Sequence, residues 1–218
     1  MLVVDLGGQY AQLIARRVRD CRVYSELVPA SITAAEVARR RARAVILSGG
    51  PASVYAPGAP SVDAGLFDAG VPVLGICYGM QLMAQELGGR VDHTDVAEYG
   101  RAELEVTDEA SRLLHDQPRD QIVWMSHRDS VKAPPEGARV VASSPTTPIA
   151  AFEDAERGLY AVQFHPEVVH TPNGQAMLEN FLLRVAGADA SWNAAAVVDE
   201  QLTCVFVDHD LGCLVLAQ

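Results

Sequence analysis

Residues 71–90, VPVLGICYGMQLMAQELGGR, decide the fold that this sequence predicts. Their first part is a short apolar run rich in β-branched residues, which is typical of a buried strand. Met83 and Leu87 belong to an apolar pattern at helical spacing, and Gly88 and Gly89 follow where a helix needs a left-handed cap. We therefore expect a buried strand, a tight turn and an amphipathic helix.

The turn between strand and helix, residues 75–79, has the pattern G-x-C-x-G, the cysteine counterpart of the G-x-S-x-G nucleophile elbow. Such a turn pushes its central side chain out of the sheet, and the flanking glycines are small because the chain folds back on itself. The helix N-terminus favours an anion, and therefore a thiolate at Cys77. The amide of Tyr78 would point the same way and supply half of an oxyanion hole. The alternative for this pentapeptide is a buried cysteine in a glycine-rich turn.

A second glycine turn, residues 48–51 (SGGP), follows an apolar strand at 44–47. Ligands of open parallel sheets bind at the carboxyl ends of the strands, which is where this turn lies. A phosphate loop is the weaker interpretation, because neither GK[ST] nor SGGxDS follows. We expect the amide of Gly50 to supply the second oxyanion donor, opposite Tyr78.

The tripeptide His165-Pro166-Glu167 directly follows an apolar strand at 159–164. Residues two apart in extended chain project to the same side, so His165 and Glu167 can lie in line. A cysteine, a histidine and a carboxylate in this order of contact are the nucleophile, base and orienting group that activate a thiol. The tripeptide alone would favour a surface turn. Together with the two glycine turns, it predicts acyl transfer at Cys77.

The whole chain alternates strands and helices, continues through a strand-rich segment and closes with a helix. This order predicts an α/β fold with a doubly wound, mostly parallel sheet flanked by helices and a small strand-rich insertion. We expect helices at 9–19, 33–41 and 174–185 besides the elbow helix. The expected strands are 2–6, 23–27, 44–47, 71–76, 90–93, 99–106, 121–124, 140–142, 149–152 and 159–164.

Composition bounds the class of protein. The 218 residues, 49% of them hydrophobic, can build one packed domain or one domain plus a fragment. A net charge of −11 argues against a nucleic-acid groove or an anionic membrane surface. No signal peptide or membrane-spanning run is evident, and the four cysteines form no CxxC pair, so we expect a cytoplasmic protein. The histidines lie in no metal-ligand spacing, so we expect no metal site.

The turns at 48–51, 75–79 and 165–167, with the chain around them, resemble the class I (triad) glutamine amidotransferases over about residues 2–187. The elbow and the HPE tripeptide are common to that family, whereas GGQY, SVY, WMSH and HPEVVHT make the amidotransferase domains of GMP synthetases the most similar branch. Leu6 stands where an aromatic residue is common, and Arg128 where glycine is usual. The shared segments are VVDLGGQYAQLIARRVR, LSGGPASVY, GICYGMQLMAQELGG, EYGR, WMSHRDSV and QFHPEVVHTPNG.

The resemblance implies a role for each matching residue in the hydrolysis of L-glutamine. Cys77 would attack the γ-carboxamide while the amides of Gly50 and Tyr78 hold the oxyanion. His165, oriented by Glu167, would take the thiol proton, give it to departing ammonia and then activate water against the γ-glutamyl thioester. The amino-acid end of glutamine would be bound by Gln81 and by a loop of Ser126, His127, Arg128 and Asp129.

The resemblance also implies a partner. Ammonia would pass to an ATP pyrophosphatase (synthetase) domain, in cis or in trans, that converts XMP to GMP with ATP and Mg²⁺; the glutaminase step needs no cofactor. Residues 1–188 resemble the amidotransferase domain, and residues 189–218 resemble a linker and a remnant of the synthetase domain without its SGGVDS loop. We expect no ATP site in the sequence as written, and any homodimer to form through the missing part. A truncated polypeptide and a longer chain with unseen segments would both give this sequence.

Two other functions stay open at this point. A stand-alone γ-glutamyl hydrolase or peptidase of the same fold would need a site open to peptides and no synthetase partner. A non-catalytic regulatory module would bind a nucleotide or a partner in the same cleft. Degenerate modules usually lose the cysteine or the histidine, and this sequence retains Cys77, His165 and Glu167.

Overall fold

This computed structural model describes residues 1–193, except for the side chains of residues 95 and 96. The strands of this part of the chain form one sheet. The strands of this part are β1 (Leu2–Asp5), β2 (Glu26–Pro29), β3 (Val45–Leu47), β4 (Val73–Ile76), β5 (Arg90–Val106), β6 (Asp120–Ala133), β7 (Arg139–Ser143), β8 (Ala151–Asp154) and β9 (Leu159–Val162). Their order in the sheet is β2-β1-β3-β4-β9-β8-β7-β5-β6. Most of the expected synthetase remnant, residues 194–218, lies outside the described residues.

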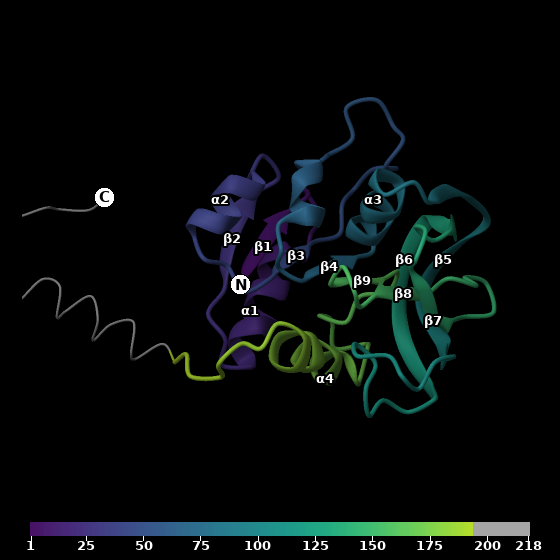
Figure 1. The fold of residues 1–218 in the computed structure, drawn as a ribbon. Coiled ribbons are helices and arrows are strands. Elements are labelled where there is room, and N and C mark those ends of the chain that lie inside the picture. Colours follow the sequence, from purple (N-terminus) through teal and green to yellow (C-terminus); the bar gives the residue numbers. More distant parts are fainter. Residues whose placement is uncertain (194–218) are drawn as a thin grey trace, which may run out of the picture.

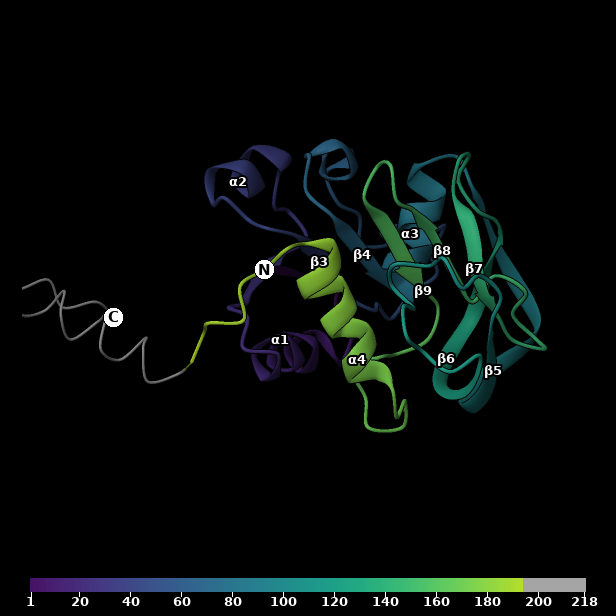
Figure 2. The ribbon, with the colours of Figure 1, turned by 60° about the horizontal axis from the view of Figure 1, so that its bottom comes forward.

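Helices cover both faces of the parallel half of this sheet (Figure 1). They are α1 (Ala11–Asp20), α2 (Ala34–Arg39), α3 (Tyr78–Glu86), α4 (Gly174–Glu179), the 3₁₀ helix η1 (Ala64–Asp68) and the π-helical η2 (Asn180–Val185). α1 and α4 lie side by side on one face, as Figure 2 also shows, and their Ile14 and Met177 share one buried apolar cluster. Val37 of α2 and Met83 of α3 belong to the cluster on the other face. Among the described helices, none combines the length and apolar composition needed to cross a membrane.

The predicted α/β fold is confirmed, and its sheet is more evenly mixed than the sequence indicated. The five strands from β2 to β9 pair in parallel, in the order β2-β1-β3-β4-β9. From β9 onward, through β8, β7, β5 and β6, every pairing is antiparallel. The strand-rich segment therefore extends the main sheet, because β8 pairs directly with β9.

The strands β5 and β6 differ most from the predicted bounds. The two segments expected at 90–93 and 99–106 form one strand, with a register shift between His93 and Glu98. β6 runs on to Ala133, so residues 126–129, which we expected in a loop, lie in a strand paired with β5. The side chains of His127 and Asp129 occupy inward positions of this strand. Their polarity hides the apolar alternation by which a strand is recognised in a sequence.

The closing helix changes its geometry halfway. α4 ends at Glu179, and the π-helical η2 continues to Val185 over the rest of the predicted range. The buried side chain of Asn180 donates hydrogen bonds from Nδ2 to the carbonyl oxygens of Leu113 (3.1 Å) and His115 (2.7 Å). Asn180 therefore ties the helix to the segment between β5 and β6.

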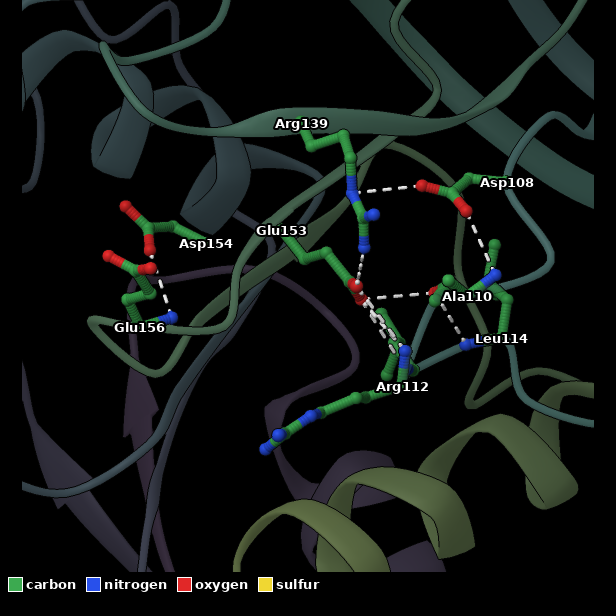
Figure 3. Close-up of polar contacts among 10 residues, drawn as sticks. Asp108, Ala110, Arg112, Leu114, Arg139, Glu153, Asp154 and Glu156 are labelled. Atoms are coloured by element: carbon green, nitrogen blue, oxygen red, sulfur yellow. Dashed lines mark hydrogen bonds and ion pairs between the residues drawn. The ribbon is translucent and has the colours of Figure 1, made fainter.

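A buried carboxylate, Glu153 of β8, holds the same segment from the other side (Figure 3). It accepts hydrogen bonds from Oγ of Ser111 (3.0 Å) and from the amide of Arg112 (3.2 Å). Arg139 of β7 bridges Glu153 (3.0 Å) and Asp108 (2.8 Å). These contacts tie the segment between β5 and β6 to β7 and β8.

Candidate active site

Cys77 lies at the sharp turn between β4 and α3, with φ 53° and ψ −104°. A non-glycine residue rarely adopts a positive φ, so the surrounding structure must hold this strained conformation in place. A Cβ added to Gly75 would lie 2.6 Å from the carbonyl oxygen of Gly79, and one added to Gly79 would lie 2.6 Å from that of Leu47. Both glycines of the G-x-C-x-G pattern are therefore required by close approach of the backbone.

His165 and Glu167 are buried beside the elbow, with 4% and 0% of their surface exposed. Nδ1 of His165 lies 2.7 Å from Oε1 of Glu167. Burial alone lowers the pKa of His165, but hydrogen bonds to Cys77 and Glu167 outweigh it and raise the pKa to about 10. With Nδ1 engaged by Glu167, Nε2 is the ring nitrogen that faces the sulfur. The histidine can thus exchange a proton with Cys77 while its ring orientation is held.

Three residues hold this histidine and carboxylate in place. Nε of Arg17 donates to the carbonyl oxygen of Glu167 (2.9 Å), and Oγ1 of Thr171 donates to that of His165 (2.7 Å). The ring of Tyr10 packs edge-on against the His165 ring, with centroids 5.3 Å apart. Sequence reasoning assigns no role to these three residues, although each lies in a segment shared with the family. A GGQY turn directly after β1 is the signal that could have found Tyr10.

Two backbone amides of residues that line the same cavity as Cys77 have no acceptor within residues 1–193. Neither Gly50 N–H nor Tyr78 N–H donates to any group in residues 1–193. A Cβ on Gly50 would come within 2.8 Å of the Tyr78 ring, so glycine is required for this close packing. Two free donors in the cavity of a nucleophile are the kind of groups that can stabilise a developing oxyanion.

A cavity of about 500 Å³ opens at the carboxyl ends of β1, β3, β4 and β9, and every predicted site residue except Glu167 lines it. Each strand contributes the turn that follows it, which is the usual place for a ligand in an open parallel sheet. The lining residues are Gly7, Gly8, Gln9, Tyr10, Gly49, Gly50, Pro51, Ala52, Ser53, Cys77, Tyr78, Gln81, Tyr99, Ser126, His127, Arg128, Asp129 and His165.

Asp129 brings a buried negative charge to the wall of this cavity. Its carboxylate accepts hydrogen bonds from Oγ of Ser53, from the hydroxyl of Tyr55 (2.8 Å) and from Nδ1 of His93 (3.1 Å). Burial acts to raise the pKa of Asp129, but these hydrogen bonds prevail and lower it. Asp129 is therefore ionised at neutral pH, and it ties β6 to the turn after β3.

Arg128 and His127 point in different directions from β6. Arg128 is exposed at the mouth of the cavity, where Nε donates to the hydroxyl of Tyr99 (3.2 Å). Nε2 of the buried His127 lies 3.3 Å from Oε2 of Glu98. Burial acts to raise the pKa of Glu98, but hydrogen bonds from His127, Thr146 and Thr147 lower it to about 2. His127 is thus engaged with Glu98 as well as lining the cavity.

Gln81 reaches from α3 into a buried network. Its Nε2 donates to the backbone oxygen of Asp129 (2.7 Å) and to Oε1 of Gln163 (3.1 Å). The sequence patterns do not single out Gln163.

No group of three or more His, Cys, Asp and Glu side chains within residues 1–193 could hold a metal ion.

The family model "Glutamine amidotransferase class-I" matches residues 2–185. The glutamine-hydrolysing GMP synthase of Parafrankia sp. is 59% identical over 215 residues, which cover 99% of this chain and 40% of the relative. The enzyme of the same name from Streptomyces coelicolor is 54% identical over 205 residues, 94% of this chain and 39% of the relative. The chain thus spans well under half the length of these two curated relatives.

Solved structures share the fold. A Thermoplasma acidophilum protein described as a GMP synthase subunit superposes with a TM-score of 0.75 and 30% identity, covering 85% of this chain and 92% of that one. A glutamine amidotransferase from Thermotoga maritima gives a TM-score of 0.68 at 18% identity, covering 85% and 96%. At that identity the second likeness concerns the fold alone.

Proposed function

Because this chain belongs to the class I glutamine amidotransferase family, we propose that it hydrolyses L-glutamine through a cysteine thioester and supplies ammonia for the conversion of XMP to GMP. The observation that carries the glutaminase part is the group of Cys77, His165 and Glu167: Cys77 and His165 line a cavity together with Gly50 and Tyr78, and Glu167 holds His165 from behind. The GMP part is supported by the identity to GMP synthases.

The first half of the reaction forms the thioester. The sulfur of Cys77 attacks the γ-carbon of glutamine, and the amides of Gly50 and Tyr78 take up the negative charge on the carbonyl oxygen. His165 carries the proton that leaves the thiol and donates it to the amide nitrogen as the C–N bond breaks and ammonia departs. Glu167 stabilises the imidazolium and keeps Nε2 of His165 toward the sulfur.

The second half regenerates the enzyme. His165, now neutral, removes a proton from a water molecule whose oxygen attacks the thioester carbon. The same two amides hold the second oxyanion, and its collapse breaks the C–S bond. Glutamate leaves, and the proton on His165 returns to the sulfur of Cys77.

Charged residues that line the cavity match the amino-acid end of glutamine. The ionised Asp129 suits the α-ammonium group, and the exposed guanidinium of Arg128 suits the α-carboxylate. Gln81 and Ser126 line the same cavity. His127 supports the wall of this cavity through its contact with Glu98 and reaches the cavity from the same strand.

The acceptor of ammonia is a synthetase domain. Residues 1–188 are the amidotransferase domain in this proposal, and residues 189–218 are a linker and part of the synthetase. The ATP and Mg²⁺ needed for GMP formation would be bound by the synthetase domain. The full reaction would take place in the cytoplasm.

A Cys77→Ala variant tests both parts of the proposal. The chain is mixed with the synthetase part of a curated relative, XMP, ATP and Mg²⁺, and GMP formation is followed with glutamine or with ammonium salt. The wild type should use both nitrogen sources, whereas the variant should use only ammonium. Thermal unfolding of both proteins shows whether the variant keeps its fold.

Other outcomes would redirect the assignment. Equal glutamine-dependent GMP formation by wild type and variant would refute the role of Cys77. Steady hydrolysis of γ-glutamyl peptides with no support of GMP synthesis would indicate a stand-alone hydrolase. A Cys77 that does not react with a glutamine-mimicking alkylator would indicate a non-catalytic module.

A further inference from the structure

Gln163 is a fully buried side chain whose amide contacts the sulfur of Cys77. It follows β9 directly, and its backbone N–H donates to the carbonyl oxygen of Ala150 (2.8 Å), so its position is fixed by the sheet. Nε2 of Gln163 donates to Sγ of Cys77 at 3.7 Å, and Oε1 accepts from Nε2 of Gln81 at 3.1 Å. No step of the proposed mechanism uses this residue.

The network around Gln163 determines which end of its amide faces the sulfur. The backbone oxygen of Asp129 can only accept, so the Gln81 side chain must turn its NH₂ group to that side. The same NH₂ group then donates to Gln163, whose oxygen must face Gln81. The NH₂ group of Gln163 is left toward the sulfur, so the hydrogen-bond network itself fixes the orientation of this amide.

The other groups that hydrogen-bond to the sulfur do not duplicate this donor. The carbonyl oxygen of Ser126 lies 3.7 Å from Sγ and accepts from the thiol, so it favours the neutral form. His165 faces the sulfur and must give up its proton during the reaction. A neutral amide keeps its hydrogens throughout, and a donor to sulfur stabilises the anion over the thiol.

We propose that Gln163 positions the sulfur of Cys77 and stabilises its thiolate. The hydrogen bonds from Gln81 to the backbone oxygen of Asp129 and to Gln163 link this donor to the wall of the glutamine cavity. The proposal deepens the proposed function and rests on it for the use made of the thiolate. It makes Gln163 a fourth member of the reactive group, beside the nucleophile, its base and the orienting carboxylate.

Alkylation of Cys77 without glutamine tests the proposal independently of turnover. The chain is treated with iodoacetamide over a range of pH, and modification of the Cys77 peptide is followed by mass spectrometry. Gln163→Met retains the unbranched shape but removes the donor, and Gln163→Glu puts an anion beside the sulfur. Asn180→Leu is the matched control, because it removes another buried amide that makes no contact with the cavity residues.

The expected result is a slower reaction with a shifted pH profile. Gln163→Met should slow alkylation at neutral pH about tenfold, which is the factor for roughly 1.4 kcal/mol, a modest charge-assisted hydrogen bond. The pH of half-maximal rate should rise, Gln163→Glu should react still more slowly, and Asn180→Leu should match the wild type. A wild-type profile in Gln163→Met would overturn the proposal, as would an equal slowing in Asn180→Leu.

Glutaminase assays separate this inference from the function itself. If the profile shifts in Gln163→Met and the wild type releases no glutamate from glutamine, the role of Gln163 stands and the proposed function fails. If the wild type hydrolyses glutamine and the profile of Gln163→Met is unchanged, the function stands and the role of Gln163 fails. Thermal unfolding of Gln163→Met and Asn180→Leu keeps any loss of folded protein out of the comparison.

Discussion

Replacement of Gly79 by alanine is the sharpest test of the elbow. An added Cβ would lie 2.6 Å from the carbonyl oxygen and 2.7 Å from the Cβ of Leu47, where ordinary contact begins at 3.4 Å. Leu47 belongs to β3, which is held between β1 and β4, so the start of α3 would have to move by about 0.8 Å. Helix propensity favours alanine by about 1 kcal/mol, and overpacking of this kind costs about 1–3 kcal/mol. The net loss of stability should be small, about 1 kcal/mol or a few degrees in Tm.

The effect on activity should be much larger than the effect on stability. Cys77 and the amide of Tyr78 directly precede Gly79, so the nucleophile and one oxyanion donor move with the helix. A misplacement near 1 Å can reduce a rate by about 10²-fold. We therefore expect Gly79→Ala to lower kcat for glutamate release about 100-fold. Both kcat and Tm are measured for the variant and for the wild type.

Gly88→Ala is the control for that experiment. Gly88 has φ +82° at the end of α3, and nothing lies within 4 Å of an added Cβ. Alanine there costs about 1 kcal/mol through its left-handed backbone alone, and kcat should stay unchanged. The reasoning would be refuted if Gly79→Ala kept its kcat within threefold of wild type, a limit well inside the roughly 10²-fold loss expected. An equal loss of activity in both variants would also refute it.

Three further predictions concern titration and burial. Burial lowers the pKa of His165 and its hydrogen bonds raise it to about 10, so Glu167→Gln should lower this pKa in an NMR titration of the ring. Because the pKa in the folded state exceeds the ordinary 6.5, the stability that His165 contributes is present below pH 6.5 and is lost toward pH 10. The free energy of unfolding measured with urea should therefore decline less steeply over this pH range in Glu167→Gln than in the wild type. An unchanged slope would contradict this. Burial of Glu98 is outweighed by hydrogen bonds that lower its pKa from 4.5 to about 2. The stability that Glu98 contributes is therefore present above pH 4.5 and is lost as pH falls toward 2, and Glu98→Gln should remove that part of the acid dependence of the free energy of unfolding in urea. Glu153→Ala leaves buried donors unpaired and should destabilise the fold by about 3–5 kcal/mol, whereas Glu156→Ala changes an exposed side chain and should be nearly neutral. Equal shifts of Tm in the two variants would argue against the role of the buried carboxylate.

Patterns local to one stretch of chain were predictable. The strand, turn and helix around Cys77 follow from an apolar run, a pair of glycines and a cap within twenty residues, and the structure has β4, the strained turn and α3 in that order. Gly88 takes the left-handed conformation expected at the helix end. Local sterics decide such features, so no distant residue has to be known.

Features that depend on partners far along the chain were not predictable. Residues 126–129 were expected in a loop, because polar side chains at inward positions of β6 give no strand signal. Asp129 is buried there only because Ser53, Tyr55 and His93 supply donors from two other segments.

The sequence by itself determined the α/β fold and the three turns that carry Cys77, Gly50 and His165, because each turn follows an apolar strand and parallel strands end at one edge of a sheet. Only the tertiary structure decided what surrounds the sulfur. Gln163 and Gln81 are 82 residues apart, and no local pattern says that one amide will orient the other. A buried polar group takes its partners from whatever the packing brings near it, and packing is a property of the whole fold.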